Sequence, residues 1–169
     1  MHWRTKISVH KDGELYVRGK KLNNIIGNAT FTENLFFVLQ GRIPSSQETA
    51  MLDAILVACC EHGVEVPSAF VPRTVASTGN PVNASIAAGA LAIGDHHGGA
   101  IECAARFLQS EKSAAEIVSD AVVKKERLAG FGHKIYKDVD PRAVVIFKKA
   151  QELALSGTYI KKIHDIRAE

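Results

Sequence analysis

Cysteine, tryptophan and aromatic residues are scarce in this chain of 169 residues, which has three cysteines, one tryptophan and 7% aromatics. Cys59 and Cys60 are neighbours and Cys103 stands apart, so the sequence has neither an even set of half-cystines nor a C-x-x-C metal spacing. This usage excludes a disulfide scaffold and is typical of a reducing compartment. We therefore expect a cytoplasmic protein in which the cysteines are small core residues.

Long apolar runs and an excess of one charge are also lacking. The longest apolar run, residues 84–93, is far shorter than the ~20 residues that span a bilayer, and residues 1–4 contain no apolar signal core. Lys and Arg number 21 against 18 Asp and Glu, so no dense basic patch indicates a nucleic-acid binder. We expect neither a membrane nor nucleic acid as a partner. The remaining composition, 46% hydrophobic and 23% charged, is that of an ordinary globular domain.

Turn and capping residues predict a mostly helical chain. Alternation of apolar and polar residues over 6–18 around Asp12-Gly13 predicts one β-hairpin. Ser or Thr followed three residues later by Glu predicts three helix starts. The predicted helices run from Thr30 to Gly41, Ser45 to Gly63, Ser68 to Gly79, Asn80-Pro81 to Gly94, about Gly99 to Leu108, Ser113 to Gly130, Asp140-Pro141 to Gly157, and from Thr158 onward.

The expected fold is all-α with a small N-terminal β-hairpin, as a single domain over residues 1–169. The last predicted helix has no stop signal, so we expect the C-terminal part to be missing. Residues 84–90 read Ala-Ser-Ile-Ala-Ala-Gly-Ala, which lets neighbouring backbones approach closely. This segment is expected to be a central helix or a subunit contact.

Three histidines, His62, His97 and His133, stand beside glycines at predicted helix boundaries. Glycine turns let backbone groups reach a ligand, and imidazole can donate, accept or titrate near neutral pH. Each histidine alone would suit a helix cap, but the clustered glycines favour a ligand site. We therefore expect the three rings to converge on one cleft.

The segments around the last two histidines suit anionic ligands. Residues 94–102 lead into a predicted helix, whose first N–H groups favour negative charge and would hold an oxyanion or enolate. Residues 130–142 place His133 beside Lys134, Lys137 and Arg142, a set suited to carboxylates or phosphates. For the two lysines, a solvated loop remains an equal alternative.

Residues 94–102 resemble the G-x-x-H-G-G-A-x-E signature of citrate synthases, and residues 130–142 resemble the second signature of that family, G-[FY]-G-H-x-[VI]-Y-K-x-x-D-P-R. The motifs are in the family's order and spacing, and residues 16–19 and 29–33 also look like its N-terminal pattern. Residues 61–63, 67–68, 76–79 and 93–95 look more like citryl-CoA lyases. The resemblance implies a multi-helical, citrate-synthase-like fold.

The resemblance also implies roles for single residues. His97 matches the histidine that stabilises the enol of acetyl-CoA, His133 the one that polarises the oxaloacetate ketone, and His62 one that contacts the acid. Arg142 matches an arginine that pairs with a substrate carboxylate. The implied coenzyme A site consists of Ala129, Gly130, Phe131, Gly132 and Lys137. Coenzyme A thioesters would be substrates, with no prosthetic group and no metal.

The implied activity is that of a citryl-CoA lyase-like enzyme, which cleaves or forms the carbon–carbon bond between an acetyl-CoA unit and oxaloacetate through an enol. Citrate or 2-methylcitrate synthase is the alternative, and a truncated non-catalytic homologue is a further one. The family's catalytic carboxylate lies in a later N-[VI]-D motif, and the sequence stops 36 residues after His133, at Glu169. We therefore expect binding with slow turnover, and the family implies a homodimer or a higher homo-oligomer.

Two metal-binding classes are disfavoured by the sequence. Asp95-His96-His97 also spells a metal motif of DHH phosphoesterases, but that class needs aspartates on parallel strands, which the sequence does not predict. The three glycine-flanked histidines contain no i, i+4 pair, so they do not indicate a zinc site. A non-catalytic helical module that only dimerises stays open.

Overall fold

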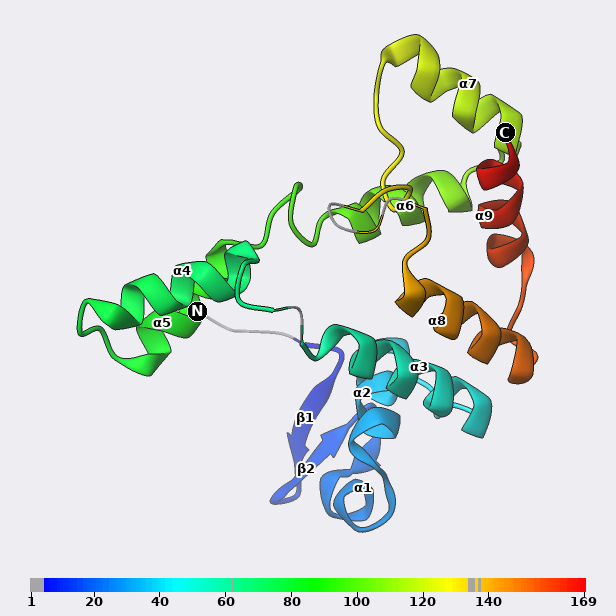
Figure 1. Ribbon diagram of the computed structural model, residues 1–169. Helices are drawn as coiled ribbons and strands as arrows, with labels where there is room; N and C mark the ends of the chain where they lie inside the picture. Colours follow the sequence, from blue (N-terminus) through cyan, green and yellow to red (C-terminus); the bar gives the residue numbers. More distant parts are fainter. Residues whose placement is uncertain (1–4, 62, 134–135, 137) are drawn as a thin grey trace. The chain divides into compact units, whose positions relative to one another are not determined.

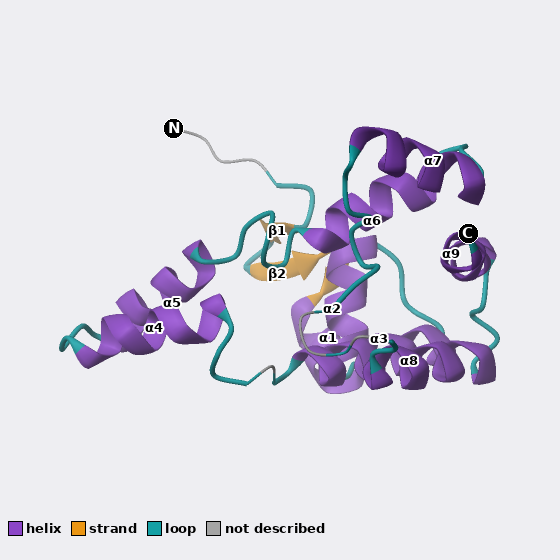
Figure 2. Ribbon diagram, turned by 45° about the horizontal axis from the view of Figure 1, so that its top comes forward, coloured by secondary structure: helices purple, strands orange, loops and turns teal. Residues whose placement is uncertain are grey.

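The computed structural model describes residues 5–61, 63–133, 136 and 138–169, and within them the chain is mostly helical (Figures 1 and 2). The strands are β1 (Ser8–Lys11), β2 (Glu14–Val17) and β3 (Lys20–Lys21). The helices are α1 (Leu22–Asn28), α2 (Phe31–Gln40), α3 (Ser46–Cys59), α4 (Pro67–Ser77), α5 (Val82–Leu91), α6 (Ala100–Gln109), α7 (Ala114–Lys124), α8 (Pro141–Glu152) and α9 (Thr158–Ala168). The predicted all-α class with a small N-terminal hairpin is confirmed.

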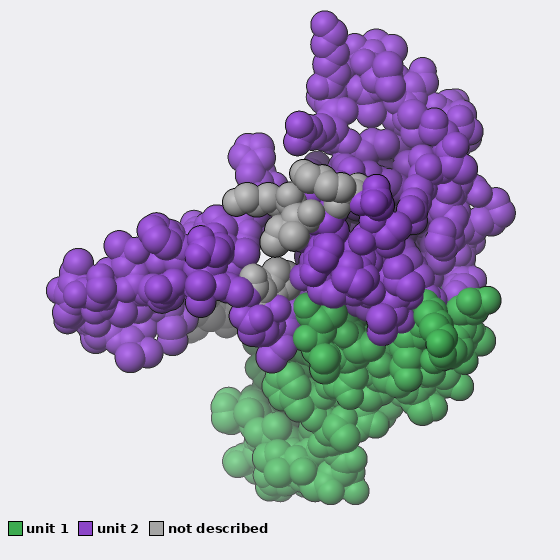
Figure 3. Space-filling view, viewed as in Figure 1, with its two compact units in different colours: residues 1–58, 148–155 green, residues 59–147, 156–169 purple. Residues whose placement is uncertain are grey.

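Two compact units divide the chain, coloured separately in Figure 3. One comprises residues 1–58 and 148–155, and the other residues 59–147 and 156–169. The first contains the sheet, α1 and α2, and the second contains α4 to α7 and α9. The single domain expected over residues 1–169 stays a prediction.

The N-terminal sheet has one strand more than the predicted hairpin. Asp12 and Gly13 form the two-residue turn with φ of 52° and 75°, the left-handed pair that suits the strand twist. β3 then pairs with β2 in an antiparallel register that joins Tyr16 to Lys21. A two-residue strand is too short to show alternation, and α1 begins without a side-chain cap, so the sequence rules predicted neither element.

The three predicted capping boxes are present. Glu33 accepts a hydrogen bond from the Thr30 amide at 2.7 Å, and Ser45 with Glu48 and Ser113 with Glu116 form the same reciprocal pair. These hydrogen bonds at the helix starts lower the pKa of Glu33 and of Glu116.

Helix ends differ more from prediction than helix starts. α3, α7 and α8 stop at Cys59, Lys124 and Glu152, several residues before the predicted glycines. After α7 and α8, Lys125 and Ala154 adopt left-handed backbone angles, both with φ of 55°. Glycine is favoured at such positions but not required. A prediction that extends each helix to the next glycine therefore overestimates the length of these helices.

The cysteines are not core residues, and that expectation is wrong. Cys59, Cys60 and Cys103 are all exposed. α3 contributes no buried residue, so the neighbouring cysteines at its end have no core to enter. Among the described residues, no helix has both the length and the apolar character needed to cross a membrane.

The second unit holds a close helix pair, α4 and α5, which run side by side in Figures 1 and 2. Gly89 of α5 is buried, and a Cβ atom there would lie 3.0 Å from the Ser68 carbonyl oxygen and 3.1 Å from Pro72 Cγ. Ile86 and Leu91 on the same helix are 65% and 86% exposed. Within this chain α5 is therefore packed on α4 rather than surrounded, and its alternative role as a subunit contact stays a prediction.

Gly89→Leu is expected to destabilise the protein by about 1–3 kcal/mol, because the new side chain has to push α4 away. Thermal unfolding followed by circular dichroism measures the loss. Gly27→Leu is the matched control, since Gly27 is also helical but a Cβ there meets nothing within 4 Å. Equal melting temperatures for the two variants would contradict the close approach of α4 and α5.

A lysine joins α9 to the end of α6. Lys162 Nζ donates to the carbonyl oxygens of Phe107, Leu108 and Ser110 at 3.4, 3.3 and 2.8 Å. These carbonyls belong to the C-terminal end of α6 or follow it, where a cation is favourable. α6, which carries the His97 loop at its start, is thereby held at its other end.

Candidate active site

His97 lies in a tight loop before α6. The Gly94 amide donates to the His97 carbonyl at 2.8 Å, the His97 amide donates back at 2.9 Å, and the Gly99 amide reaches the Gly94 carbonyl at 3.0 Å. A Cβ at Gly99 would lie 2.6 Å from Asp95 Cα, so only glycine allows this closure. The motif glycines therefore shape the loop that presents the histidine.

Ser68, from the first turn of α4, hydrogen-bonds the His97 ring. Its Oγ lies 2.9 Å from Nε2, and its backbone N–H lies 3.4 Å from the same nitrogen. Because the Ser68 backbone N–H can only donate, Nε2 is the acceptor, which places the ring proton on Nδ1 and lets the Ser68 hydroxyl donate to Nε2 as well. The His97 ring then presents an N–H donor, as stabilisation of an enolate oxygen requires.

Arg142 and Asp140 form a two-point ion pair at the start of α8. Asp140 Oδ2 accepts Nη2 at 2.6 Å, and Oδ1 accepts Nε at 3.0 Å. Oδ1 also accepts the Arg142 backbone amide at 2.9 Å, so Asp140 is the predicted helix cap as well. Hydrogen bonds from Arg142 lower the pKa of Asp140 to about 2, so this carboxylate stays charged at acidic pH values at which an ordinary aspartate takes up a proton.

His133 adjoins this ion pair. Its Nε2 lies 3.1 Å from Arg142 Nη2, its Nδ1 accepts the Tyr136 amide at 3.2 Å, and its ring centroid is 4.9 Å from that of Tyr136. The Arg142 guanidinium lies 6.0 Å from the Tyr136 ring centroid. The structure therefore brings together two residues that the sequence analysis singled out, His133 and Arg142.

The loop predicted to line the coenzyme A site packs on α6. The Phe131 ring lies 6.3 Å from the ring of Phe107, centroid to centroid, and a Cβ at Gly130 would be 3.9 Å from Ala104 Cβ. Gly130 has a left-handed φ of 84°, which turns the loop. The backbone from Ala129 to Gly132 lies outside any helix or strand.

Some predicted residues remain untested. His62 and Lys137 lie outside the described residues, as does Lys134. His97 contacts Ser68, and His133 contacts Arg142. Because His62 lies outside the described residues, convergence of the three histidines on one cleft stays a prediction. In the described ranges no group of three or more His, Cys, Asp or Glu side chains is placed to hold a metal ion.

Ser68, Tyr136 and the orienting role of Asp140 were not predicted as parts of the site. Ser68 stands 29 residues before His97, and no spacing rule links a serine in one helix to a histidine in a later loop. The sequence pattern predicted Asp140 only as a residue at the start of a helix.

Comparison with known proteins identifies the class. Residues 28–167 match the family described as "Citrate synthase, C-terminal domain". The chain belongs to the citrate synthase family.

Individual relatives carry several activities. The chain is 32% identical over 130 residues to citrate/2-methylcitrate synthase of Bacillus subtilis, and 35% identical over 122 residues to 2-methylcitrate synthase of Shewanella oneidensis. These alignments cover 73% and 69% of this chain but 34% and 32% of the relatives, so the chain spans about a third of their length.

The solved structure of citryl-CoA lyase from Hydrogenobacter thermophilus is similar, with a TM-score of 0.91 and 39% identity. It matches 97% of this chain and 66% of its own. A Methanosaeta concilii ATP citrate lyase, at 21% identity and a TM-score of 0.88, shares the fold.

Proposed function

We propose that the chain supplies part of the active site of a citryl-CoA lyase, which cleaves citryl-CoA into acetyl-CoA and oxaloacetate or joins them in reverse. The observation that carries the proposal is the 39% identity to citryl-CoA lyase over nearly the whole chain, with both histidine segments intact. Citrate or 2-methylcitrate synthesis is the second candidate, because the curated relatives quoted above carry those names.

During cleavage, negative charge has to be stabilised at two oxygens, that of the citryl hydroxyl and that of the thioester. A base takes the proton of the citryl hydroxyl, the bond between that carbon and the acetyl α-carbon breaks, and the electron pair passes into a thioester enolate. The enolate then takes a proton on carbon, which leaves acetyl-CoA and oxaloacetate. His97 Nδ1–H would donate to the thioester oxygen as it becomes negative, and His133 would contact the oxygen that becomes the ketone.

The carboxylates of the acid would be held by Arg142, with His62 as a further contact. Asp140 accepts hydrogen bonds from Nε and Nη2 of the guanidinium. It would thereby fix the orientation of the Arg142 side chain and leave the remaining N–H groups for a substrate carboxylate. Ala129 to Gly132 and Lys137 would hold the coenzyme A portion.

We also propose that a second copy covers α5. On α5, the apolar residues Val82, Ile86 and Leu91 are 75%, 65% and 86% exposed. Exposed apolar patches favour association with another protein surface.

The experiment that tests the activity gives the chain citryl-CoA and measures both products. A lyase releases acetyl-CoA and oxaloacetate without free thiol, whereas a synthase hydrolyses the thioester and releases free coenzyme A with citrate. We expect slow release of oxaloacetate without thiol, because residues 1–169 do not contain the motif that carries the family's carboxylate, and a His133→Ala variant should lose even this activity. Thiol release would assign the synthase reaction instead, and neither product with retained binding of citrate would assign a non-catalytic homologue.

A further inference from the structure

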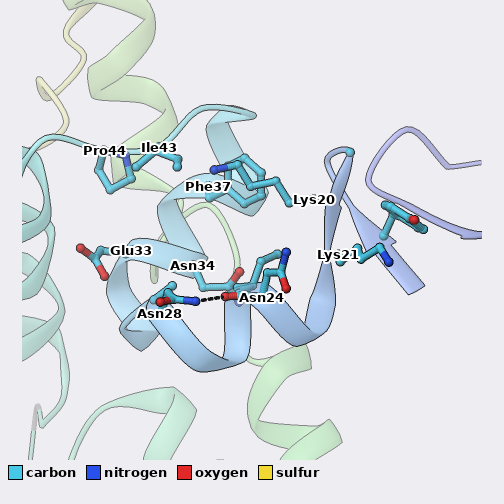
Figure 4. Close-up of a pocket in the computed structure, with 13 residues that line it drawn as sticks. Lys20, Lys21, Asn24, Asn28, Glu33, Asn34, Phe37, Ile43 and Pro44 are labelled. Carbon is cyan, nitrogen blue, oxygen red and sulfur yellow. Dashed lines mark hydrogen bonds between the residues drawn. The ribbon is translucent and has the colours of Figure 1, made fainter. Parts of the chain in front are cut away.

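The contacts around His133 lie within the second unit. A cavity of about 610 Å³ is present in the first unit, with walls from β2, β3, α1, α2 and the loop that precedes α3 (Figure 4). None of the residues that line it belongs to the candidate active site. His133, Tyr136 and Arg142 all belong to the second unit, so their contacts form within one compact part of the chain.

The orientation of the His133 ring depends on its neighbours. His133 is exposed and lies outside any helix or strand. Fixing an exposed side chain in one rotamer costs conformational entropy, which contacts with other groups have to offset. A ring that has to meet a single oxygen of a substrate acts efficiently only when its orientation is fixed in advance. Residues that contact the ring in the free protein therefore bear on catalysis.

Tyr136 makes two contacts with His133. Its backbone N–H donates to Nδ1 at 3.2 Å, and the two ring centroids are 4.9 Å apart with 35° between the ring planes. Aromatic pairs attract one another at centroid separations of about 4.5–7 Å. Any residue except proline could supply the amide contact, whereas the ring contact requires an aromatic side chain at position 136.

The same ring also lies near Arg142. The guanidinium carbon is 6.0 Å from the Tyr136 ring centroid, which is the outer limit for attraction between a cation and an aromatic face. Arg142 Nη2 is 3.1 Å from His133 Nε2, so the three side chains form one cluster. Tyr136 is 39% exposed and is therefore not a core residue. Burial in the core does not account for the position of its ring.

We propose that Tyr136 is a positioning residue whose ring holds the imidazole of His133 beside Arg142. This role rests on the proposed function, in which Arg142 holds a carboxylate of the acid and His133 contacts the oxygen that becomes the ketone. With the Tyr136 ring in place, the two groups keep a separation at which one small acid meets both. Tyr136 acts through His133 and makes no contact with the reacting atoms.

Kinetics of two variants test the role of the ring. Tyr136→Leu removes the ring and should lower kcat for citryl-CoA cleavage about three- to tenfold, which corresponds to the usual contribution of an aromatic pair. Tyr136→Phe keeps the ring and should restore most of the rate. Tyr159→Leu is the matched control, because it removes another exposed tyrosine, in the first turn of α9, and should leave kcat unchanged. An unchanged kcat in Tyr136→Leu, or equal losses in Tyr136→Leu and Tyr136→Phe, would overturn the proposal.

Nuclear magnetic resonance of the free chain tests the position of the His133 ring without turnover. The sequence has seven histidines, and the ring protons of His133 are identified by their absence from the spectrum of His133→Gln. Because an aromatic ring shifts the resonances of nearby protons, these signals should move toward those of a solvated histidine in Tyr136→Leu. They should keep their positions in Tyr136→Phe. Identical His133 signals in the unaltered chain and in Tyr136→Leu would overturn the proposal.

Two further outcomes separate this role from the fold and from the proposed function. The melting temperature of Tyr136→Leu should equal that of Tyr136→Phe, and a clearly lower value would assign the ring to the fold and overturn the proposal. If the unaltered chain does not act on citryl-CoA, the proposed function fails. The resonance comparison then still decides whether Tyr136 holds the His133 ring, so the two failures are distinguishable.

Discussion

Replacing His97 with alanine is expected to lower kcat for citryl-CoA cleavage by about 10²–10³, which is the usual effect of losing one donor to an enolate or oxyanion. The reason is that the Ser68 contacts at Nε2 leave Nδ1–H as the ring's donor. KM for citryl-CoA should change little, because the donor matters most after charge has developed. Steady-state kinetics on the unaltered chain and on the His97→Ala variant measures both constants.

His96→Ala is the matched control, since His96 is the exposed neighbour in the same loop. Ser68→Ala should reduce kcat about tenfold, because partners that orient a metal-bound imidazole contribute about 10- to 100-fold and Ser68 would orient the His97 ring in the same way. Ser68→Thr keeps the hydroxyl and should restore most of the rate. Equal activity of the His97→Ala and His96→Ala proteins would remove His97 from the mechanism.

Replacing Arg142 with glutamine is expected to weaken citrate binding by about 10- to 100-fold, because hydrogen bonds to charged groups contribute about 1.5–3 kcal/mol. Its effect should shrink as salt is added, since the guanidinium is partly exposed, with 37% of its side chain accessible. Calorimetric titration with citrate measures the change. Arg106→Gln is the control, because Arg106 also forms an ion pair but on the open face of α6.

Asp140→Asn separates orientation from competition. Asparagine can still cap α8 but loses the charge that holds the guanidinium. If Asp140 orients Arg142, citrate binding becomes weaker in this variant. Tighter binding would show that Asp140 competes with the substrate for the fork, and would contradict the orienting role.

The parts of the fold that the sequence predicted well depend on contacts between near neighbours. The capping boxes at Thr30, Ser45 and Ser113 and the turn at Asp12-Gly13 each involve residues no more than three apart. Local hydrogen bonds and backbone angles decide such features, so residue type and spacing are sufficient. The His133–Arg142 contact is similar in kind, because one short motif contains both residues.

Helix ends and burial were predicted less well, because both depend on surroundings. Lys125 and Ala154 end helices where glycine was expected further along. Cys59 and Cys60 are exposed because α3 has no buried position in this chain. A helical pattern shows which residues can share a face, but not whether another element covers that face.

By itself the sequence determined the helical class, the helix starts and the two histidine segments that place the chain in its family. Only the tertiary structure decided that Ser68 is the partner of His97, since α4 and the loop after α5 meet through packing rather than through spacing. The small side chains of α5 permit that packing: Gly89 lets α4 approach until the Ser68 backbone is in contact.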